Sequence, residues 1–241
     1  MSILRDSPHL TDHDDGTVDE YRSVSGWAVA ALILGLLAPV ALIDIWLGVI
    51  PLAGIVVAVV ALVRMALLAP ALTGRKAALA GLFLSVLFAS AAGADYLAYW
   101  RAVDREARRF AHAWFDFLAD DQPHKAHQLT LMPRYRQSLD DTLREFYRED
   151  EQWREELEDY VEQPVVRTLL ALGAGARARY DTTEASGRDA RSIAVRQRFA
   201  VTYDDAEQGR TTFFVRLGMQ RLPLEHHQAA WRMMHVEEVE P

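Results

Sequence analysis

The sequence contains no cysteine, so disulfide bonds and thiolate metal sites are excluded. It also lacks a Gly-rich phosphate loop, a nucleophile elbow and an HExxH zinc motif, which are short signatures of catalytic sites. The largest shortage is of charge, because residues 27–100 hold only five charged side chains in 74 positions. This long apolar region, rather than any catalytic motif, organises the rest of the chain.

Residues 27–63 contain a single charged side chain, Asp44. As one straight helix this run would be about 55 Å long, whereas the hydrocarbon core of a bilayer is about 30 Å thick. The run must therefore fold back, and Asp44 with Trp46 marks the break, because both side chains prefer the membrane interface. A buried core of a soluble protein is disfavoured, since these runs show no polar face. The prediction is three membrane spans, listed in order as residues 27–43, 45–63 and 77–100.

Small residues recur at every fourth position of the third span: Ala77, Gly81, Ser85, Ala89 and Gly93. Shorter pairs of the same kind occur in the first two spans: Ala31 with Gly35, and Gly54 with Ala58. Such ridges allow helix backbones to approach closely in lipid. Two interpretations stay open, a compact three-helix bundle within one chain, which we favour, and homo-oligomerisation through the third span.

The loop between the second and third spans carries Arg64, Arg75 and Lys76, and the loop between the first two carries no Lys or Arg. By the positive-inside rule the basic loop and the N-terminus are cytoplasmic, and residues 101–241 lie outside. Four arginines directly after the third span oppose this rule: Arg101, Arg105, Arg108 and Arg109. They open a long domain, and long domains cross a membrane largely regardless of charge. We therefore expect a multi-pass cell-membrane protein with an extracytoplasmic C-terminal domain.

The two ends of the chain are acidic. Residues 1–26 hold two Arg against six Asp and Glu, which predicts a disordered cytoplasmic tail and not a signal peptide. His9 and His13, beside Asp12, could bind a metal there, but a flexible tail makes this the disfavoured interpretation. Residues 101–241 hold 21 Lys and Arg against 26 Asp and Glu, which argues against nucleic-acid binding. Their length suits one soluble domain.

Three stretches of the membrane part carry a family resemblance: ALILGL at 31–36, GIVVAVVAL at 54–62 and LTGRKAALAGL at 72–82. They resemble a family of small bacterial membrane domains of unknown function, built from Gly- and Ala-rich helices. The chain departs from this family at Ala58, where Gly is more common. The resemblance covers residues 27–100 and implies a membrane module fused to an extracytoplasmic domain. It implies no catalytic residues.

After residue 100, apolar residues at three- and four-residue spacing predict an amphipathic helix at 103–119, separated from the third span by a short break. We expect Trp114, on its apolar stripe, to lie in the domain core under a sheet rather than at the membrane surface. Further helices are predicted at 124–129, from an N-cap at Ser138 to about residue 161, and at 165–172. The helix that starts at Ser138 is expected to bury Leu139 and to bend or break at Asp150.

Beyond Gly175 the apolar period changes to two, which predicts strands. Their expected ranges are 176–183, 193–203, 213–220 and 229–239. In the last strand Trp231 and Met233 lie on one side and Met234 and Val236 on the other, so a β-bulge is expected. Helices followed by an antiparallel meander give an α+β domain with helices packed on a curved sheet. This element order resembles the NTF2-like (cystatin-like) fold.

Three groups of polar residues are candidate sites. His124 and His127 share a helix face and could begin a metal site, with a third ligand from among His112, His226, His227 and His235. Structural or surface roles are favoured for this pair. Arg134, Tyr135 and Arg136 could bind an anion, although solvated loop residues are the favoured interpretation.

Asp44 and Asp95 could mark an ion pathway, but both are placed at span ends, where water reaches them. We therefore predict no catalytic, metal-binding or cofactor-binding residue. The expected function is a membrane-anchored, non-enzymatic module whose partners are the bilayer and either a small ligand or an envelope protein. The alternative is an enzyme that uses acid–base chemistry in the cone of the sheet, where one carboxylate or His with a shifted pKa would be needed among apolar walls.

Overall fold

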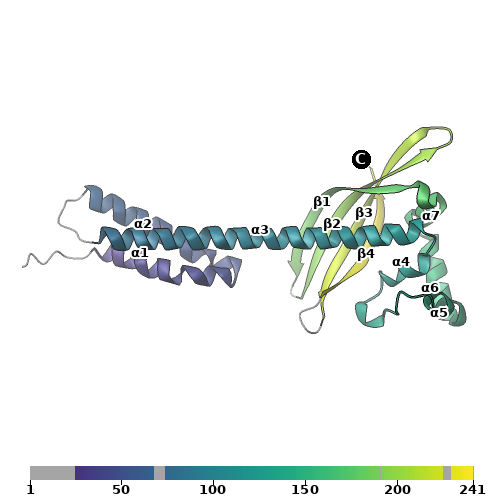
Figure 1. Cartoon of the computed structure of the whole chain (residues 1–241), viewed down its shortest axis with the longest axis horizontal. Coiled ribbons are helices and arrows are strands. Elements are labelled where there is room, and N and C mark those ends of the chain that lie inside the picture. Colours follow the sequence, from purple (N-terminus) through teal and green to yellow (C-terminus); the bar gives the residue numbers. More distant parts are fainter. Residues whose placement is uncertain (1–24, 68–73, 190, 225–228, 241) are drawn as a thin grey trace, which may run out of the picture. The chain divides into compact units, whose positions relative to one another are not determined.

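The computed structural model describes residues 25–67, 74–189, 191–224 and 229–240. The chain forms two compact units, Met1–Ala98 and Tyr99–Pro241. The predicted disordered tail, with His9 and His13, lies outside the described residues. Figure 1 labels the helices and strands of both units.

The first apolar helix ends where the sequence predicts a break. Helix α1 spans Gly26–Leu37 and continues as a 3-10 helix, η1, over Ala38–Leu42. The Asp44 carboxylate then accepts a hydrogen bond from the Trp46 backbone N–H at 3.1 Å, which caps the next 3-10 helix, η2 (Ile45–Gly48). Helix α2 follows over Val49–Leu67. The break at Asp44 is confirmed.

Two helices of the described chain are long and apolar enough to cross a membrane, namely Ile45–Leu67 and α3, Arg75–Ala119. In each, only 22% of the most apolar window is buried inside the protein. The first apolar helix, Gly26–Leu42, is shorter than these two. Pro39 stands at the start of its 3-10 part, where it cannot donate an α-helical backbone hydrogen bond. By length, the described residues therefore support two of the three predicted spans, and the first helix falls short of that length.

Helix α3 shows no interruption after the predicted third span. It runs for 45 residues from Arg75 to Ala119, so the short break expected near residue 100 is absent. The physical reason is local, because residues 95–105 contain neither Gly nor Pro and no residue type that would end a helix. One helix therefore joins the apolar region to the second unit.

Small residues bring the helices of the first unit into contact. A Cβ atom added at Gly81 would lie under 3.0 Å from the Ala31 carbonyl oxygen. A Cβ at Gly35 would come equally close to the Gly81 backbone, and one at Gly54 to the Ser85 hydroxyl. The predicted packing role of Gly81 is confirmed, and its partners belong to the same chain, as in the favoured bundle.

Replacing Gly81 with Leu should destabilise the first unit by about 1–3 kcal/mol, because the new side chain must push α1 away. Leu is well tolerated in an apolar helix, so membrane insertion should survive. Thermal unfolding of the purified chain in detergent measures the effect. Gly93→Leu on the same helix is the matched control, since a Cβ at Gly93 meets no atom within 4 Å. Equal melting temperatures for both variants would show that the Gly81 face is not packed.

Within the described residues, the second unit contains α3 from Tyr99 onward, four short α-helices and one sheet. The helices are α4 (Pro123–Gln128), α5 (Leu143–Glu149), α6 (Glu151–Glu162) and α7 (Pro164–Leu172), with 3-10 helices η3 (Pro133–Tyr135) and η4 (Gly173–Gly175). The strands are β1 (Arg177–Asp189), β2 (Ser192–Asp205), β3 (Gly209–Pro223) and β4 (Ala229–Val239). They form an antiparallel meander in the order β1-β2-β3-β4. The α+β class is confirmed.

The helix predicted with its N-cap at Ser138 begins four residues later than expected, with Thr142 at the N-cap position. The Asp140 carboxylate accepts hydrogen bonds from the Thr142 backbone N–H (3.0 Å) and hydroxyl (2.5 Å), which forms a turn, and α5 starts only at Leu143. Ser138 caps no helix, and Leu139, expected to be buried, is 40% exposed. Both predictions were wrong, because the turn at Asp140 competes successfully with helix formation.

The predicted interruption at Asp150 is confirmed and has a clear cause. The Asp150 backbone is extended, and its carboxylate accepts hydrogen bonds from the backbone N–H groups of Gln152 (3.0 Å) and Trp153 (3.2 Å). Asp150 therefore ends α5 and caps α6 in one step.

The core of the second unit lies between α3 and one face of the sheet (Figure 1). Trp114 is fully buried there, and its neighbour Phe115 contacts Phe199 of β2 with ring centroids 5.3 Å apart. The predicted core position of Trp114 is confirmed. The predicted bulge in β4 is confirmed as well, because Met233 and His235 pair with consecutive residues of β3 and leave Met234 without a partner across the ladder.

Candidate functional site

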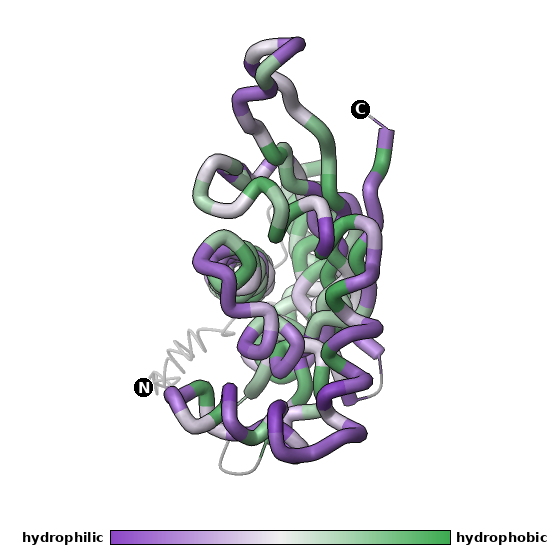
Figure 2. Tube along the Cα trace, turned by 90° about the vertical axis from the view of Figure 1, so that its right-hand side faces the viewer, coloured by the Kyte–Doolittle hydropathy of each residue, from purple (hydrophilic) through white to green (hydrophobic). Residues whose placement is uncertain are grey.

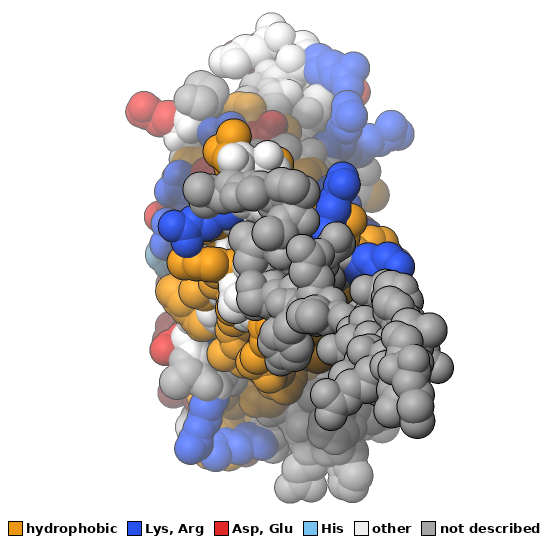
Figure 3. Space-filling view, turned by 90° about the vertical axis from the view of Figure 1, so that its left-hand side faces the viewer, with side chains coloured by type: hydrophobic (Ala, Val, Ile, Leu, Met, Phe, Trp, Pro, Cys, Tyr) orange, Lys and Arg blue, Asp and Glu red, His pale blue; other side chains and the backbone are white. Residues whose placement is uncertain are grey.

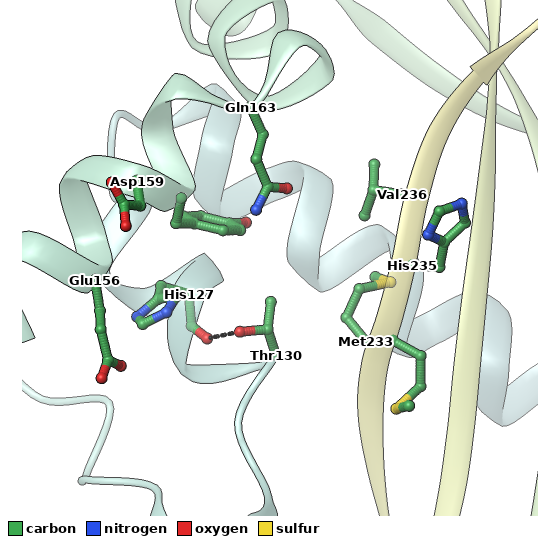
Figure 4. A pocket seen from close by; sticks show the side chains of 10 residues that line it. His127, Thr130, Glu156, Asp159, Gln163, Met233, His235 and Val236 are labelled. Atoms are coloured by element: carbon green, nitrogen blue, oxygen red, sulfur yellow. Dashed lines mark hydrogen bonds between the residues drawn. The ribbon is translucent and has the colours of Figure 1, made fainter.

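A cavity of about 300 Å³ opens between the segment at α4, helix α6 and strand β4 (Figure 4). Its lining residues are His127, Thr130, Glu156, Asp159, Tyr160, Gln163, Met233, Met234, His235 and Val236. They combine an apolar wall with several hydrogen-bonding groups. This mixture is typical of sites that bind small molecules.

Helix α6 supplies the acidic side of the cavity. Glu156, Asp159 and Tyr160 are spaced three and four residues apart, so they share one face of the helix. Figure 4 shows Glu156 and Asp159 on this helix. Glu156 is half-buried and accepts a hydrogen bond from the Gln152 side chain at 3.1 Å, whereas Asp159 is exposed. The cavity therefore has negative charge at its edge.

His127 reaches the cavity from α4 and is held by a chain of buried hydrogen bonds. The Gln128 amide donates to the Tyr147 hydroxyl at 2.8 Å, and this hydroxyl lies 2.7 Å from His127 Nδ1. Because burial raises the pKa of Tyr147 to about 12, the hydroxyl keeps its proton and can donate it to Nδ1. In the tautomer in which Nδ1 accepts a hydrogen bond from this hydroxyl, His127 carries its own proton on Nε2.

The charge state of His127 follows from its burial. The side chain is 6% exposed, and loss of hydration lowers its pKa below the usual value, although the carboxylate of Glu156 opposes the change. The imidazole is therefore neutral at neutral pH. A neutral imidazole beside a carboxylate can bind polar groups and can also exchange protons.

Strand β4 forms the apolar wall. Its bulge places Met233 and His235 next to the cavity, and Figure 4 shows both side chains on this strand. Two bonds attach β4 to the segment after α4, from the Met233 backbone N–H to the Leu129 carbonyl (2.9 Å) and from Arg232 to the Thr130 carbonyl (2.7 Å). Bulges often occur beside functional sites, where they redirect side chains.

The basic cluster at residues 134–136 does not behave as one site. Arg136 is partly buried, and its guanidinium donates to the carbonyl oxygens of Leu129 (3.1 Å), Leu131 (3.1 Å) and Trp231 (2.5 Å). Burial and the nearby Arg232 lower the pKa of Arg136 to about 10, so the group stays charged at neutral pH. Arg136 is therefore a structural cross-link between the segment after α4 and β4, contrary to both sequence interpretations.

The predicted histidine pair is buried and does not assemble a metal site among the described residues. His124 and His127 are both buried, and the part of the chain that the structure describes holds no group of three His, Asp or Glu suited to a metal. His112 packs edge-on against Phe199 in the core, with ring centroids 5.6 Å apart. His226 and His227 lie outside the described residues.

The two acidic residues of the apolar region have separate settings. Asp44 caps η2, as described above, and Asp95 is exposed on α3. Neither lines a described cavity. Their positions give no support to an ion pathway.

A larger hollow of about 650 Å³ lies on the sheet around the small residues Ala185, Gly187, Ala194 and Gly218. Its main charged group, Arg216, is already paired with Glu184 (2.6 Å) and Glu237 (2.7 Å). Arg196 also lines this hollow, and within the described residues it forms no ion pair. The cavity at His127 is the better candidate site because it combines a buried imidazole with two carboxylates.

The second unit should lose stability as the pH falls below about 6.5, partly through His127. The pKa of His127 is lower in the folded state than the usual 6.5. The stability that depends on the neutral imidazole is therefore fully present above pH 6.5 and is lost as the pH falls through the folded pKa. Denaturant unfolding of the chain between pH 7.5 and 5 measures this slope. His127→Gln should flatten it. An unchanged slope in His127→Gln would contradict the assignment.

The sequence indicated only part of this site. His127 was singled out for its spacing to His124, whereas Glu156 and Asp159 were assigned to a solvated charged face. Their spacing with Tyr160 was the available signal. No family model, curated protein or solved structure matches the chain.

Proposed function

We propose that the chain is a membrane-anchored binding module, with a three-span anchor and an NTF2-like domain displayed outside the cytoplasm. The observation that carries the proposal is the exposure of apolar side chains over the first unit, for example Trp46 (84%), Ile43 (80%) and Leu67 (79%). Water-soluble proteins rarely leave large continuous apolar patches uncovered. A bilayer covers such a surface without further protein.

The short first helix is compatible with a third span. Its α-helical part, Gly26–Leu37, rises about 18 Å and its 3-10 part, Ala38–Leu42, rises about 10 Å. The sum approaches the roughly 30 Å of a hydrocarbon core. An odd number of spans then separates the N-terminus from the second unit, and the basic loop that contains Arg64, Arg75 and Lys76 favours the cytoplasm for the N-terminus.

Membrane anchoring and orientation can be measured together. The full chain should stay in the membrane pellet after an alkaline carbonate wash. Reporter fusions should give an external signal at Asp44, a cytoplasmic signal at Arg75 and an external signal at Pro241. Release by carbonate would contradict the anchor, and a cytoplasmic signal at Pro241 would contradict the orientation.

The proposed ligand site is the cavity at His127. Its volume of about 300 Å³ suits a small molecule or one side chain of a protein partner. Met233 and Val236 would pack against an apolar part, while the Nε2–H of His127 and the Glu156 carboxylate would bind polar groups. Small molecules that copurify with the chain, identified by mass spectrometry, should be depleted in Met233→Trp, which fills the cavity.

An enzyme is the second candidate, and the buried neutral imidazole of His127 beside Glu156 favours it. We prefer a binding role because the cavity lining lacks a Ser or Lys, and its Tyr160 hydroxyl accepts a hydrogen bond from Trp114 at 2.7 Å. Incubation of the copurified ligand with fresh protein distinguishes the two. Recovery of the ligand unchanged supports binding, and its conversion by the wild type but not by His127→Gln supports an enzyme.

A further inference from the structure

One end of the second unit combines aromatic, basic and exposed apolar side chains. We call it the basic end and define it by Tyr99, Trp100, Arg101, Arg188, Arg191 and Leu224. Arg101, Arg188 and Arg191 are exposed, and within the described ranges none of the three forms an ion pair. Leu224 is 42% exposed.

Contacts between α3 and the sheet show that the residues of the basic end lie at the same position along the axis of α3. The Arg188 guanidinium lies over the Tyr99 ring, 5.3 Å from its centroid, so the β1–β2 turn lies beside the start of the unit. On the neighbouring hairpin, Arg221 bonds Glu106 at 2.9 Å. The three residues from Arg221 to Leu224 span about 10 Å in an extended chain, and the seven residues from Glu106 back to Tyr99 span about 10 Å along the helix. Leu224 therefore lies near the same position along the α3 axis as Tyr99.

The direction of β3 agrees with this placement. Gln197 of β2 bonds Asp104 at 2.8 Å, and Phe199 contacts Phe115 further along, so β2 runs in the same direction as α3. Strand β3 is antiparallel to β2 and therefore carries the chain toward Tyr99 as it approaches Leu224. In Figure 1 the C-terminal end of β1 lies at the opposite end of the sheet from α4–α7.

Charge is distributed unevenly along the second unit. The region of α5 and α6, residues 143–162, holds three Arg against nine Asp and Glu, and it is largely hydrophilic in Figure 2. It follows the C-terminal end of α3, whereas the basic end contains Arg101, Arg188 and Arg191, which form no ion pair with another described residue. Figure 3 shows Lys and Arg side chains beside hydrophobic ones on one face of the molecule. This acidic region therefore lies at the other end of the unit, and Asp189 of β1 is an acidic residue next to Arg188 at the basic end.

We propose that the basic end binds the headgroups of anionic phospholipids. Tyr and Trp prefer the level of the headgroups, which is also where lipid phosphates lie. Arg101, Arg188 and Arg191 would contact these phosphates, and Leu224 would enter the apolar boundary beneath them. This inference rests on the proposed membrane anchor and adds to it a preference for negatively charged lipid.

The test uses the full chain purified in a neutral detergent and titrated with dihexanoyl phosphatidylglycerol or dihexanoyl phosphatidylcholine. Native mass spectrometry counts the bound lipids. The wild type should bind phosphatidylglycerol more tightly than phosphatidylcholine. The double variant R188Q/R191Q should lose about 25-fold in apparent affinity for phosphatidylglycerol, since one basic residue at an anionic surface contributes about fivefold.

The matched control is R177Q/R179Q, which removes two exposed arginines from the other end of β1. It should bind phosphatidylglycerol as the wild type does. No preference for phosphatidylglycerol in the wild type, or an equal loss in the control, would overturn the proposal. Full competition by glycerol phosphate would also overturn it, because the ligand would then be a soluble anion. The carbonate wash tests the anchor independently, so failure of one idea is distinguishable from failure of the other.

Discussion

Replacing Trp114 with Ala is expected to lower the free energy of unfolding of the second unit by about 3–5 kcal/mol. Trp114 is 0% exposed, its ring lies 5.0 Å from that of Phe115, and its Nε1–H donates to the Tyr160 hydroxyl at 2.7 Å. Truncation therefore opens a cavity in the core and leaves a buried hydroxyl with one bond fewer. Denaturant unfolding of the full chain in detergent, followed by circular dichroism of the sheet, measures the loss.

Trp46→Ala provides the comparison, because Trp46 is 84% exposed. It should leave the unfolding of the second unit unchanged. If Trp114→Ala and Trp46→Ala gave the same stability as the wild type, α3 would not be the core helix of the sheet.

Replacing Arg136 with Met should destabilise the second unit by roughly 2–4 kcal/mol. The substitution keeps much of the apolar stem but removes the donors to the carbonyls of Leu129, Leu131 and Trp231. Bonds from a charged donor contribute about 1.5–3 kcal/mol each, and carbonyls that lose a partner bear a desolvation penalty. The same unfolding measurement applies, and faster hydrogen exchange at Met233 is expected, because its N–H bonds Leu129.

Arg134→Met is the matched control two positions away. Arg134 lies over the Tyr135 ring at 4.6 Å, and Tyr135 is 56% exposed, so this substitution should change stability by less than about 1 kcal/mol. Equal effects of the two substitutions would show that Arg136 is not a cross-link.

Features that depend on neighbouring residues were largely available from the sequence. The helical period placed Trp114 on a buried stripe, and the change to a period of two located the strands. Asp150 interrupted one helix and began the next, as its place in the apolar stripe indicated. The conflict between Met233 and Met234 anticipated the bulge in β4. Each of these signals spans at most a few helical turns or strand residues.

Local patterns failed where two local structures compete. Ser138 was a suitable helix cap, but the turn built by Asp140 and Thr142 took its place. The first predicted span, residues 27–43, was near the lower length limit for a membrane helix. Pro39 lies in a 3-10 segment there, and the helix is shorter than the two span-length helices. Composition does not record such differences in backbone geometry.

By itself, the sequence determined that an apolar, nearly uncharged region precedes an α+β domain, because burial and exposure impose periods on adjacent residues. Only the tertiary structure decided that His127, Glu156 and Met233 surround one cavity and that Arg136 joins two distant segments. These residues lie up to about a hundred positions apart, and the packing of α6 and β4 around α4 brings them together. No periodicity within one element contains that information, since a cavity forms where several elements meet.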